Sequence, residues 1–244
     1  MKILKRLVIV LTPVLVIGFG AFFWYVNDYY EGTEVATSAL TSDESVTVKE
    51  ADSVIQFSPS QVADGTVGII FYPGGKVDEE AYAPLMKGLA EVGYQVFLVE
   101  MPFNLAVFGT GAAEDIIVSH PEITNWYLVG HSLGGSMGAI FAEANSDKIK
   151  GLILLASYST ADLSESGLAV MSIHGSQDGV LNMEKLAEYQ PMLPADFEEV
   201  MIDGGNHGQF GDYGHQEGDG QASLSAKDQQ AMTISAITEF IQAH

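Results

Sequence analysis

Cysteine is absent from the 244-residue sequence, so the chain forms no disulfide, and processing as a lipoprotein is excluded. Positive charge is scarce, because the chain has only ten Lys and Arg residues against 32 Asp and Glu residues. Three of the basic residues, Lys2, Lys5 and Arg6, lie at the N-terminus, and the other seven lie beyond residue 26 together with all the acidic ones. The formal net charge of −22 at pH 7 repels phosphate backbones and anionic headgroups. Nucleic acid is therefore not an expected partner.

Charged residues are also missing from Leu7 to Val26. As a helix, these twenty residues would be about 30 Å long, which matches the hydrocarbon core of a membrane. The basic residues before them predict a cytoplasmic flank over 1–6, a transmembrane anchor over 7–26 and a catalytic domain outside the cytoplasm. The alternatives are a cleaved signal peptide, although no A-x-A-like site ends the run, and a buried core helix.

The segment after this run is polar. Residues 27–51 are rich in Ser, Thr, Glu and Asp and contain few large apolar residues after Tyr30. Such a composition cannot bury much apolar surface, so it predicts a solvated tether between the anchor and a domain over 52–244.

From residue 52 onward, short apolar runs alternate with helical patterns, which is typical of an α/β fold with a mostly parallel sheet and helices on both faces. The expected strands cover 53–57 (an edge strand), 65–72, 94–99, 125–130, 149–156, 168–174 and 198–202, and the expected helices cover 84–93, 112–119, 133–145, 183–189 and 228–241. Only about eleven residues, 157–167, separate two of these strands, so there is almost no room for a lid and the pocket should be open.

A Gly-x-Ser-x-Gly motif, Gly130–Gly134, joins the strand beginning at Asn125 to a small-residue helix. In this strand–turn–helix context the motif carries a nucleophilic serine, Ser132, on a tight turn that needs glycine on both sides. The amide of Leu133 then lies at a helix N-terminus, where unpaired N–H groups favour negative charge.

Four motifs now form a recognisable set: YPGGKVD at 72–78, GHSLGG at 130–135, GSQD at 175–178 and GGNH at 204–207. Together they resemble the α/β-hydrolase fold superfamily, and the resemblance covers nearly all of 52–244. More narrowly, they are similar to a small bacterial membrane-anchored subgroup near the dienelactone-hydrolase-like enzymes. That resemblance implies esterase or related hydrolase activity.

The order of three residues matches this fold: nucleophile Ser132, acid Asp178, base His207. Each follows a predicted strand, and the carboxyl ends of parallel strands collect ligands. The imidazole would take the serine proton, and the carboxylate would orient the imidazole. Asp162 is the alternative acid, and the other histidines considered as the base are His131, His174 and His215.

An oxyanion hole needs two N–H donors. One is predicted at Leu133, and the resemblance places the other just past the glycines of YPGGK, at Gly75 or Lys76. Phe103, Asn104 and Phe210 are candidate substrate contacts, on loops expected near the catalytic end of the sheet.

The stretch 208–220 is rich in glycine and acids, and it has two interpretations. Asp212, Glu217 and Asp219 are potential ligands of a divalent cation, but their spacing matches no metal-loop motif. An ordered surface loop anchored by Phe210 and Tyr213 is favoured, and neither a metal nor an organic cofactor is expected.

The sequence thus predicts a membrane-anchored serine hydrolase that cleaves a small ester or similar acyl substrate through an acyl-enzyme on Ser132. An acyltransferase would use the same acyl-enzyme and is the nearest alternative. A non-catalytic binding or scaffold protein on the same fold is the alternative from another class, as is a membrane-tethered interaction domain. The substrate, its acyl chain length and the oligomeric state do not follow from the sequence.

Overall fold

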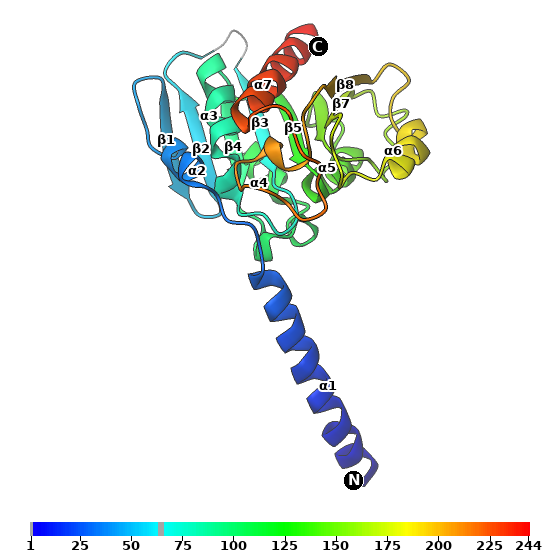
Figure 1. Ribbon diagram of the computed structural model, residues 1–244. Helices are drawn as coiled ribbons and strands as arrows, with labels where there is room; N and C mark the ends of the chain where they lie inside the picture. The colour runs from blue at the N-terminus through cyan, green and yellow to red at the C-terminus, as the bar shows by residue number, and fades with distance from the viewer. Residues whose placement is uncertain (1, 63–65) are drawn as a thin grey trace.

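The computed structural model describes residues 2–62 and 66–244, with side chains from residue 11 onward. Its centre is a single sheet in the order β1-β2-β4-β3-β5-β6-β7-β8 (Figure 1). The strands are β1 (Val46–Ala51), β2 (Val54–Pro59), β3 (Val67–Tyr72), β4 (Gln95–Val99), β5 (Asn125–His131), β6 (Gly151–Leu155), β7 (Ala169–Gly175) and β8 (Glu198–Ile202). Strands β1 and β2 pair antiparallel to their neighbours, and the pairs from β4 through β3 to β8 are all parallel.

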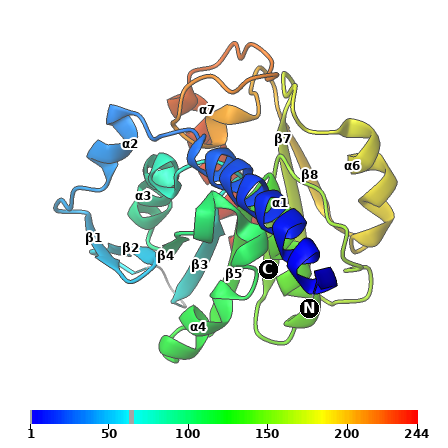
Figure 2. The same ribbon diagram turned by 90° about the horizontal axis from the view of Figure 1, so that it is seen from below.

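The helices are α1 (Lys2–Asn27), α2 (Glu34–Ala39), α3 (Ala83–Val92), α4 (Ala112–Ser119), α5 (Leu133–Ala144), α6 (Met183–Tyr189) and α7 (Ala226–Ala243). Short 3₁₀ turns are η1 (Glu79–Tyr82), η2 (Pro102–Asn104), η3 (Ala106–Phe108), η4 (Gln190–Met192) and η5 (Gly208–Phe210). Helices α3 and α7 cover one face of the sheet, and α4 and α5 cover the other. The view from below shows α3 and α4 on opposite sides of the sheet (Figure 2).

Strand β3 shows why both faces must be covered. All six of its residues are buried, and its five side chains alternate between two cores. Ile69 and Phe71 pack with α3 and α7, whereas Ile70 and Tyr72 pack with α4 and α5. Successive strand residues point to opposite faces, so a continuous apolar run fits only a sheet sandwiched by helices. The predicted parallel sheet with helices on both faces is confirmed.

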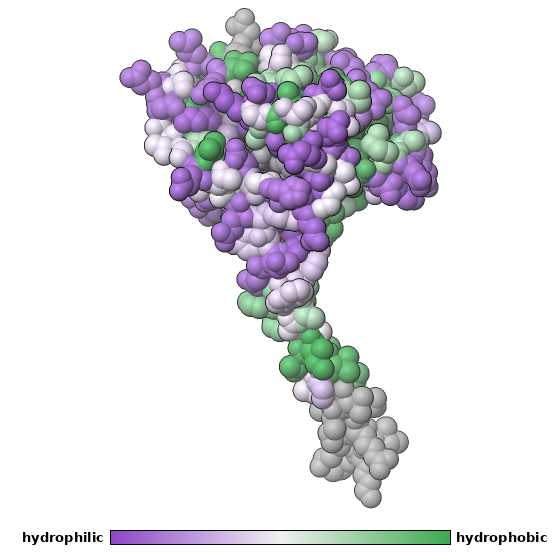
Figure 3. Space-filling view, viewed as in Figure 1, coloured by the Kyte–Doolittle hydropathy of each residue, from purple (hydrophilic) through white to green (hydrophobic). Residues whose placement is uncertain are grey.

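The transmembrane helix predicted over 7–26 is wrong. Among the helices in the described part of the chain, none is long and apolar enough to span a bilayer. Helix α1 occupies this region and projects from the body as a single rod with apolar side chains near its base (Figures 1 and 3). The predicted basic flank over 1–6 lies outside the residues whose side chains are described.

The solvated tether predicted over 27–51 is instead largely folded onto the body. Thr33 caps α2, the side chain of Ala36 is fully buried, and β1 pairs with β2 from Val46↔Pro59 to Ala51↔Val54. The sheet therefore begins at residue 46, and β1 rather than β2 forms its edge. An edge strand with only one covered face needs few apolar residues, so its polar composition concealed it.

Candidate active site

The turn between β5 and α5 carries Ser132 at φ 51° and ψ −119°, a backbone conformation that non-glycine residues rarely adopt. The strain is held by close packing on both sides. A Cβ at Gly130 would lie 2.6 Å from the backbone of Gly134, and a Cβ at Gly134 would overlap the carbonyl oxygen of Tyr72. The Ser132 N–H donates to the Leu155 carbonyl at 2.9 Å, which ties the turn to β6. The geometry is that of a nucleophile elbow.

Asp178 and His207 follow β7 and β8, and the structure brings them together. His207 Nδ1 lies 2.9 Å from Asp178 Oδ2, and the side chains of His207 and Asp178 are only 2% and 1% exposed. The other carboxylate oxygen of Asp178 accepts the N–H groups of Val180 at 2.9 Å and Leu181 at 2.7 Å. Burial acts to raise the pKa of Asp178, but the His207 contact and these two amides outweigh it and hold the pKa below its usual value. Asp178 is therefore ionised at neutral pH.

Ser132 and His207 line one pocket of about 260 Å³, together with Leu133, Ser136, Ala156, Ser157, Tyr158, Val180, Leu181 and Asn182. His207 Nε2 is buried and has no hydrogen-bond partner within the described residues. This nitrogen is therefore available to a hydroxyl that enters hydrogen-bond distance. Catalytic hydrogen bonds are often long before substrate binds and tighten in the reacting complex.

The amides of the YPGGK loop differ in what they can bind. Gly74 N–H donates to the Tyr82 hydroxyl at 3.0 Å, and Lys76 N–H donates to the Asn104 carbonyl at 2.8 Å. Within the described residues, only the Gly75 amide between them has no acceptor. A Cβ on Gly75 would lie 2.9 Å from the Leu133 side chain, so this glycine faces the first residue of α5. Of the two predicted second donors, the geometry favours Gly75 over Lys76.

The structure does not bring the three predicted substrate contacts to the Ser132 pocket. Phe103, at φ 61°, is 53% exposed and packs edge-on against Phe22 of α1, with ring centroids 5.4 Å apart. Asn104 holds the Lys76 amide, and Phe210 is fully buried. The Lys76 side chain also points elsewhere and forms an ion pair with Asp28 at 2.9 Å.

The rival acid and bases lie apart from Ser132 or are otherwise engaged. The carboxylate of Asp162 accepts the hydroxyl and N–H groups of Ser164 in an exposed turn. His174, on β7, has Glu199 as its nearest acidic partner at 3.9 Å, and His215 is exposed.

His131 is a buried neighbour of the site whose placement the sequence did not indicate. Its ring centroid lies 4.6 Å from that of His207, and its Nδ1 lies 2.8 Å from the Tyr82 hydroxyl that also holds Gly74. Burial, with the nearby His207, holds the pKa of His131 well below its usual value, so the ring is neutral. Tyr82 thus links the loop that carries Gly74 to the imidazole ring next to His207. No local pattern marks Tyr82, which lies in an ordinary helical stretch.

Acidification is expected to destabilise the fold through His131. Its folded-state pKa lies below the unfolded value of about 6.5, so the stabilisation is complete above that pH and is lost as the pH falls below it. One such group costs up to about 1.4 kcal/mol per pH unit. Urea unfolding at pH 7.5 and 5.5 should show a smaller loss of unfolding free energy in His131→Gln than in the wild type. Equal losses in the two proteins would contradict this.

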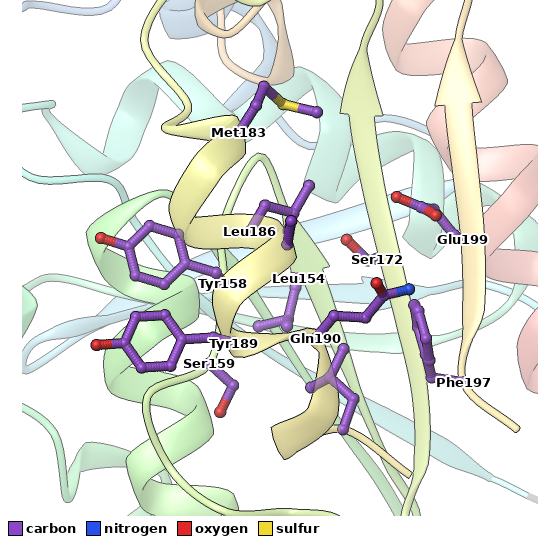
Figure 4. A pocket seen from close by; sticks show the side chains of 12 residues that line it. Leu154, Tyr158, Ser159, Ser172, Met183, Leu186, Tyr189, Gln190, Phe197 and Glu199 are labelled. Carbon is purple, nitrogen blue, oxygen red and sulfur yellow. The ribbon is translucent and has the colours of Figure 1, made fainter. Parts of the chain in front are cut away.

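A second, more enclosed pocket of about 140 Å³ lies beneath α6 (Figure 4). Leu154, Ser172 and Glu199 of the sheet face Leu186 of α6 across it. None of the three predicted catalytic residues lines it, although Tyr158 contributes to both pockets. The predicted nucleophile and base therefore line the Ser132 pocket and not this one.

Comparison with known families decides the classification. Residues 68–231 match the model of the alpha/beta hydrolase family, a span that includes Ser132, Asp178 and His207. The chain belongs to the alpha/beta hydrolase family. None of the curated proteins compared with this hydrolase matches it significantly.

Solved structures share the fold at low identity. A CIB-like hydrolase from Thermoplasma acidophilum is 14% identical with a TM-score of 0.59, and a Klebsiella pneumoniae protein assigned to the dienelactone hydrolases is 14% identical with a TM-score of 0.56. The alpha/beta hydrolase MGS-MChE2, from a lagoon-sediment metagenome in Morocco, is 16% identical with a TM-score of 0.58. Each comparison covers 79% of this chain and 98% of the other. The family and these neighbours support a hydrolytic function.

Proposed function

We propose that this hydrolase cleaves esters or similar acyl bonds through a covalent acyl-enzyme on Ser132. The observation that carries the proposal is the buried His207–Asp178 pair. His207 lines the same pocket as Ser132, and its Nε2 has no hydrogen-bond partner within the described residues. A serine hydroxyl is a weak nucleophile until a base takes its proton. Here an ionised carboxylate on one side of the imidazole leaves the other nitrogen as that base.

The first half of the reaction forms a bond from Ser132 Oγ to the acyl carbon. His207 Nε2 takes the hydroxyl proton, Asp178 stabilises the imidazolium, and the carbonyl oxygen becomes an oxyanion. Leu133 at the start of α5 and the unpaired Gly75 amide supply two N–H groups for that charge. The bond to the leaving alcohol then breaks, and His207 returns the proton to the departing oxygen.

In the second half, water attacks the acyl-enzyme, and His207 takes the water proton and returns it to Ser132 Oγ. The acid product leaves and the enzyme is regenerated. An alcohol in place of water would make the same enzyme an acyltransferase. Because residues 157–167 form only a short connection between β6 and β7, this connection holds no inserted lid over the pocket, which suits small acyl groups.

The direct test is covalent labelling by a fluorophosphonate, which reacts with an activated serine and not with an ordinary one. The full-length protein should gain the mass of one phosphonyl group, and peptide mapping should place it on Ser132. Ser136, which lines the same pocket, provides the internal comparison because its hydroxyl is bound to the Tyr158 carbonyl at 2.9 Å. Label on Ser136, or none on the folded protein, would overturn the proposal. Turnover that depends on an added alcohol would identify an acyltransferase instead.

A further inference from the structure

The acid and the base of the proposed triad lie on separate loops. Asp178 follows β7 and His207 follows β8, and their side chains meet at 2.9 Å only if the two loops are held in register. Upstream of the pair the loops bind each other directly, because the Gln177 N–H donates to the Gly205 carbonyl and the Gly204 N–H donates to Ser176 Oγ, each at 2.8 Å. Next to the pair itself, the N–H groups of Gly179, His207 and Gly208 are bound by a third segment.

The carboxylate of Asp219 makes that connection. It lies in the glycine-rich stretch between η5 and α7, and its Oδ1 accepts the N–H of Gly179 at 3.1 Å and that of His207 at 3.2 Å. The same oxygen accepts the adjacent Gly220 N–H at 2.8 Å, and Oδ2 accepts the N–H of Gly208 at 2.8 Å. One side chain thus binds the acid loop and the base loop together.

The close approach of these segments is built into the chain. A Cβ on Gly179 would lie 2.6 Å from the Gly218 carbonyl oxygen, and one on Gly220 would overlap the carbonyl oxygen of Gln177. Only glycine at both positions lets the 218–220 backbone lie flat against the acid loop. The glycines that made this stretch conspicuous in the sequence therefore permit the contact that Asp219 makes.

The base is held from its other side by α7. Gln229 accepts the Asn206 N–H at 2.9 Å and donates to the Asn206 carbonyl at 2.8 Å. Asn206 in turn donates its side-chain amide to the Gly220 carbonyl at 2.9 Å. Because Asp219 accepts the N–H groups of His207 and Gly208, the backbone is hydrogen-bonded on both sides of the His207 side chain.

We propose that Asp219 is a positioning residue of the triad. Its carboxylate fixes the backbone of His207 relative to that of Asp178 and so keeps Nε2 directed at the Ser132 pocket. This inference rests on the proposed serine-hydrolase function. The sequence made Asp219 a potential cation ligand. In the structure its two carboxylate oxygens instead accept hydrogen bonds from four backbone N–H groups.

The test is a graded pair of variants in the full-length protein. Asp219→Ala removes all four acceptor contacts and should lower kcat for p-nitrophenyl acetate about 10- to 100-fold, because a misplacement of about 1 Å can cost that much. KM should change by less than about threefold, since Asp219 does not line the substrate pocket. Asp219→Asn keeps one carbonyl oxygen, so it should retain the three contacts of Oδ1 and lose less activity. Glu217→Ala removes a nearby exposed carboxylate of the same loop and should match the wild type.

A spectroscopic readout separates this proposal from the proposed function. The proton shared by His207 Nδ1 and Asp178 should give a low-field ¹H NMR resonance that Glu217→Ala preserves and Asp219→Ala broadens or shifts upfield. The resonance does not require turnover, so a protein that keeps it but never labels on Ser132 overturns the hydrolase function alone. A folded Asp219→Ala protein with unchanged kcat and resonance overturns the positioning role. If Asp219→Ala does not fold, Asp219→Ser, whose hydroxyl is too short to reach the amides of both loops, takes its place, and an unchanged kcat and resonance in that protein overturn the positioning role.

Discussion

Replacing Ser132 with alanine should reduce kcat for a short p-nitrophenyl ester by about 10⁴-fold or more. Ser132 supplies the oxygen of the acyl-enzyme bond, and no other hydroxyl in the pocket is placed on the strained turn after β5. Whatever rate remains would come from binding and from the oxyanion donors, which the substitution leaves in place. The melting temperature should change little, because the backbone contacts of Ser132 persist in the variant.

Ser136, which lines the same pocket, provides the matched control. Ser136 and Ser157 bond to each other and to backbone carbonyls beneath the elbow, so Ser136→Ala should keep most of the activity while modestly lowering stability. Steady-state kinetics and thermal unfolding on the wild type and the two variants separate loss of the nucleophile from loss of support. If Ser132→Ala retains more than about a hundredth of the wild-type kcat, the acyl-enzyme mechanism cannot stand.

The sequence was sufficient for strands β2 to β8 and for the candidate residues that follow three of them. Runs such as 65–72 and 149–156 are apolar on both faces and bounded by turn residues, and β3 and β6 lie within them. Ser132, Asp178 and His207 were identified because each follows a predicted strand, and the parallel topology places such residues at one edge. These features are encoded within a few neighbouring residues.

The parts that the sequence did not predict depend on contacts between distant segments. The choice between Gly75 and Lys76 turns on the Asn104 carbonyl, and the role of Asp219 turns on amides up to forty residues away. Strand β1 has a polar composition and gains its place only by pairing with β2. At β1 the sequence pattern missed an element, whereas over 7–26 it predicted one too many. The long apolar run predicts a membrane span, but no helix in the described part of the chain is long and apolar enough to be one.

The choice of acid is the second prediction with a large effect. Asp178→Asn should lower kcat by about 10³- to 10⁴-fold, as the same change does in other Ser-His-Asp triads. The amides of Val180 and Leu181 would hold the carbonyl oxygen of the substituted side chain, which turns its NH₂ group toward His207 Nδ1. His207 would then carry its proton on Nε2, where it cannot accept the proton of Ser132.

Asp162→Asn is the matched control, because Asp162 follows the preceding strand β6 and is the position some hydrolases of this fold use for the acid. Among the residues that the structure describes, its carboxylate bonds only to Ser164, in an exposed turn, so the variant should keep wild-type kcat. The comparison is best run between about pH 6 and 8, where the lowered pKa of Asp178 keeps that carboxylate ionised in the wild type. Fluorophosphonate labelling rates should follow kcat, since both report the basicity of Nε2. If Asp162→Asn is the slower enzyme, the buried His207–Asp178 pair is structural and the acid role passes to the loop after β6.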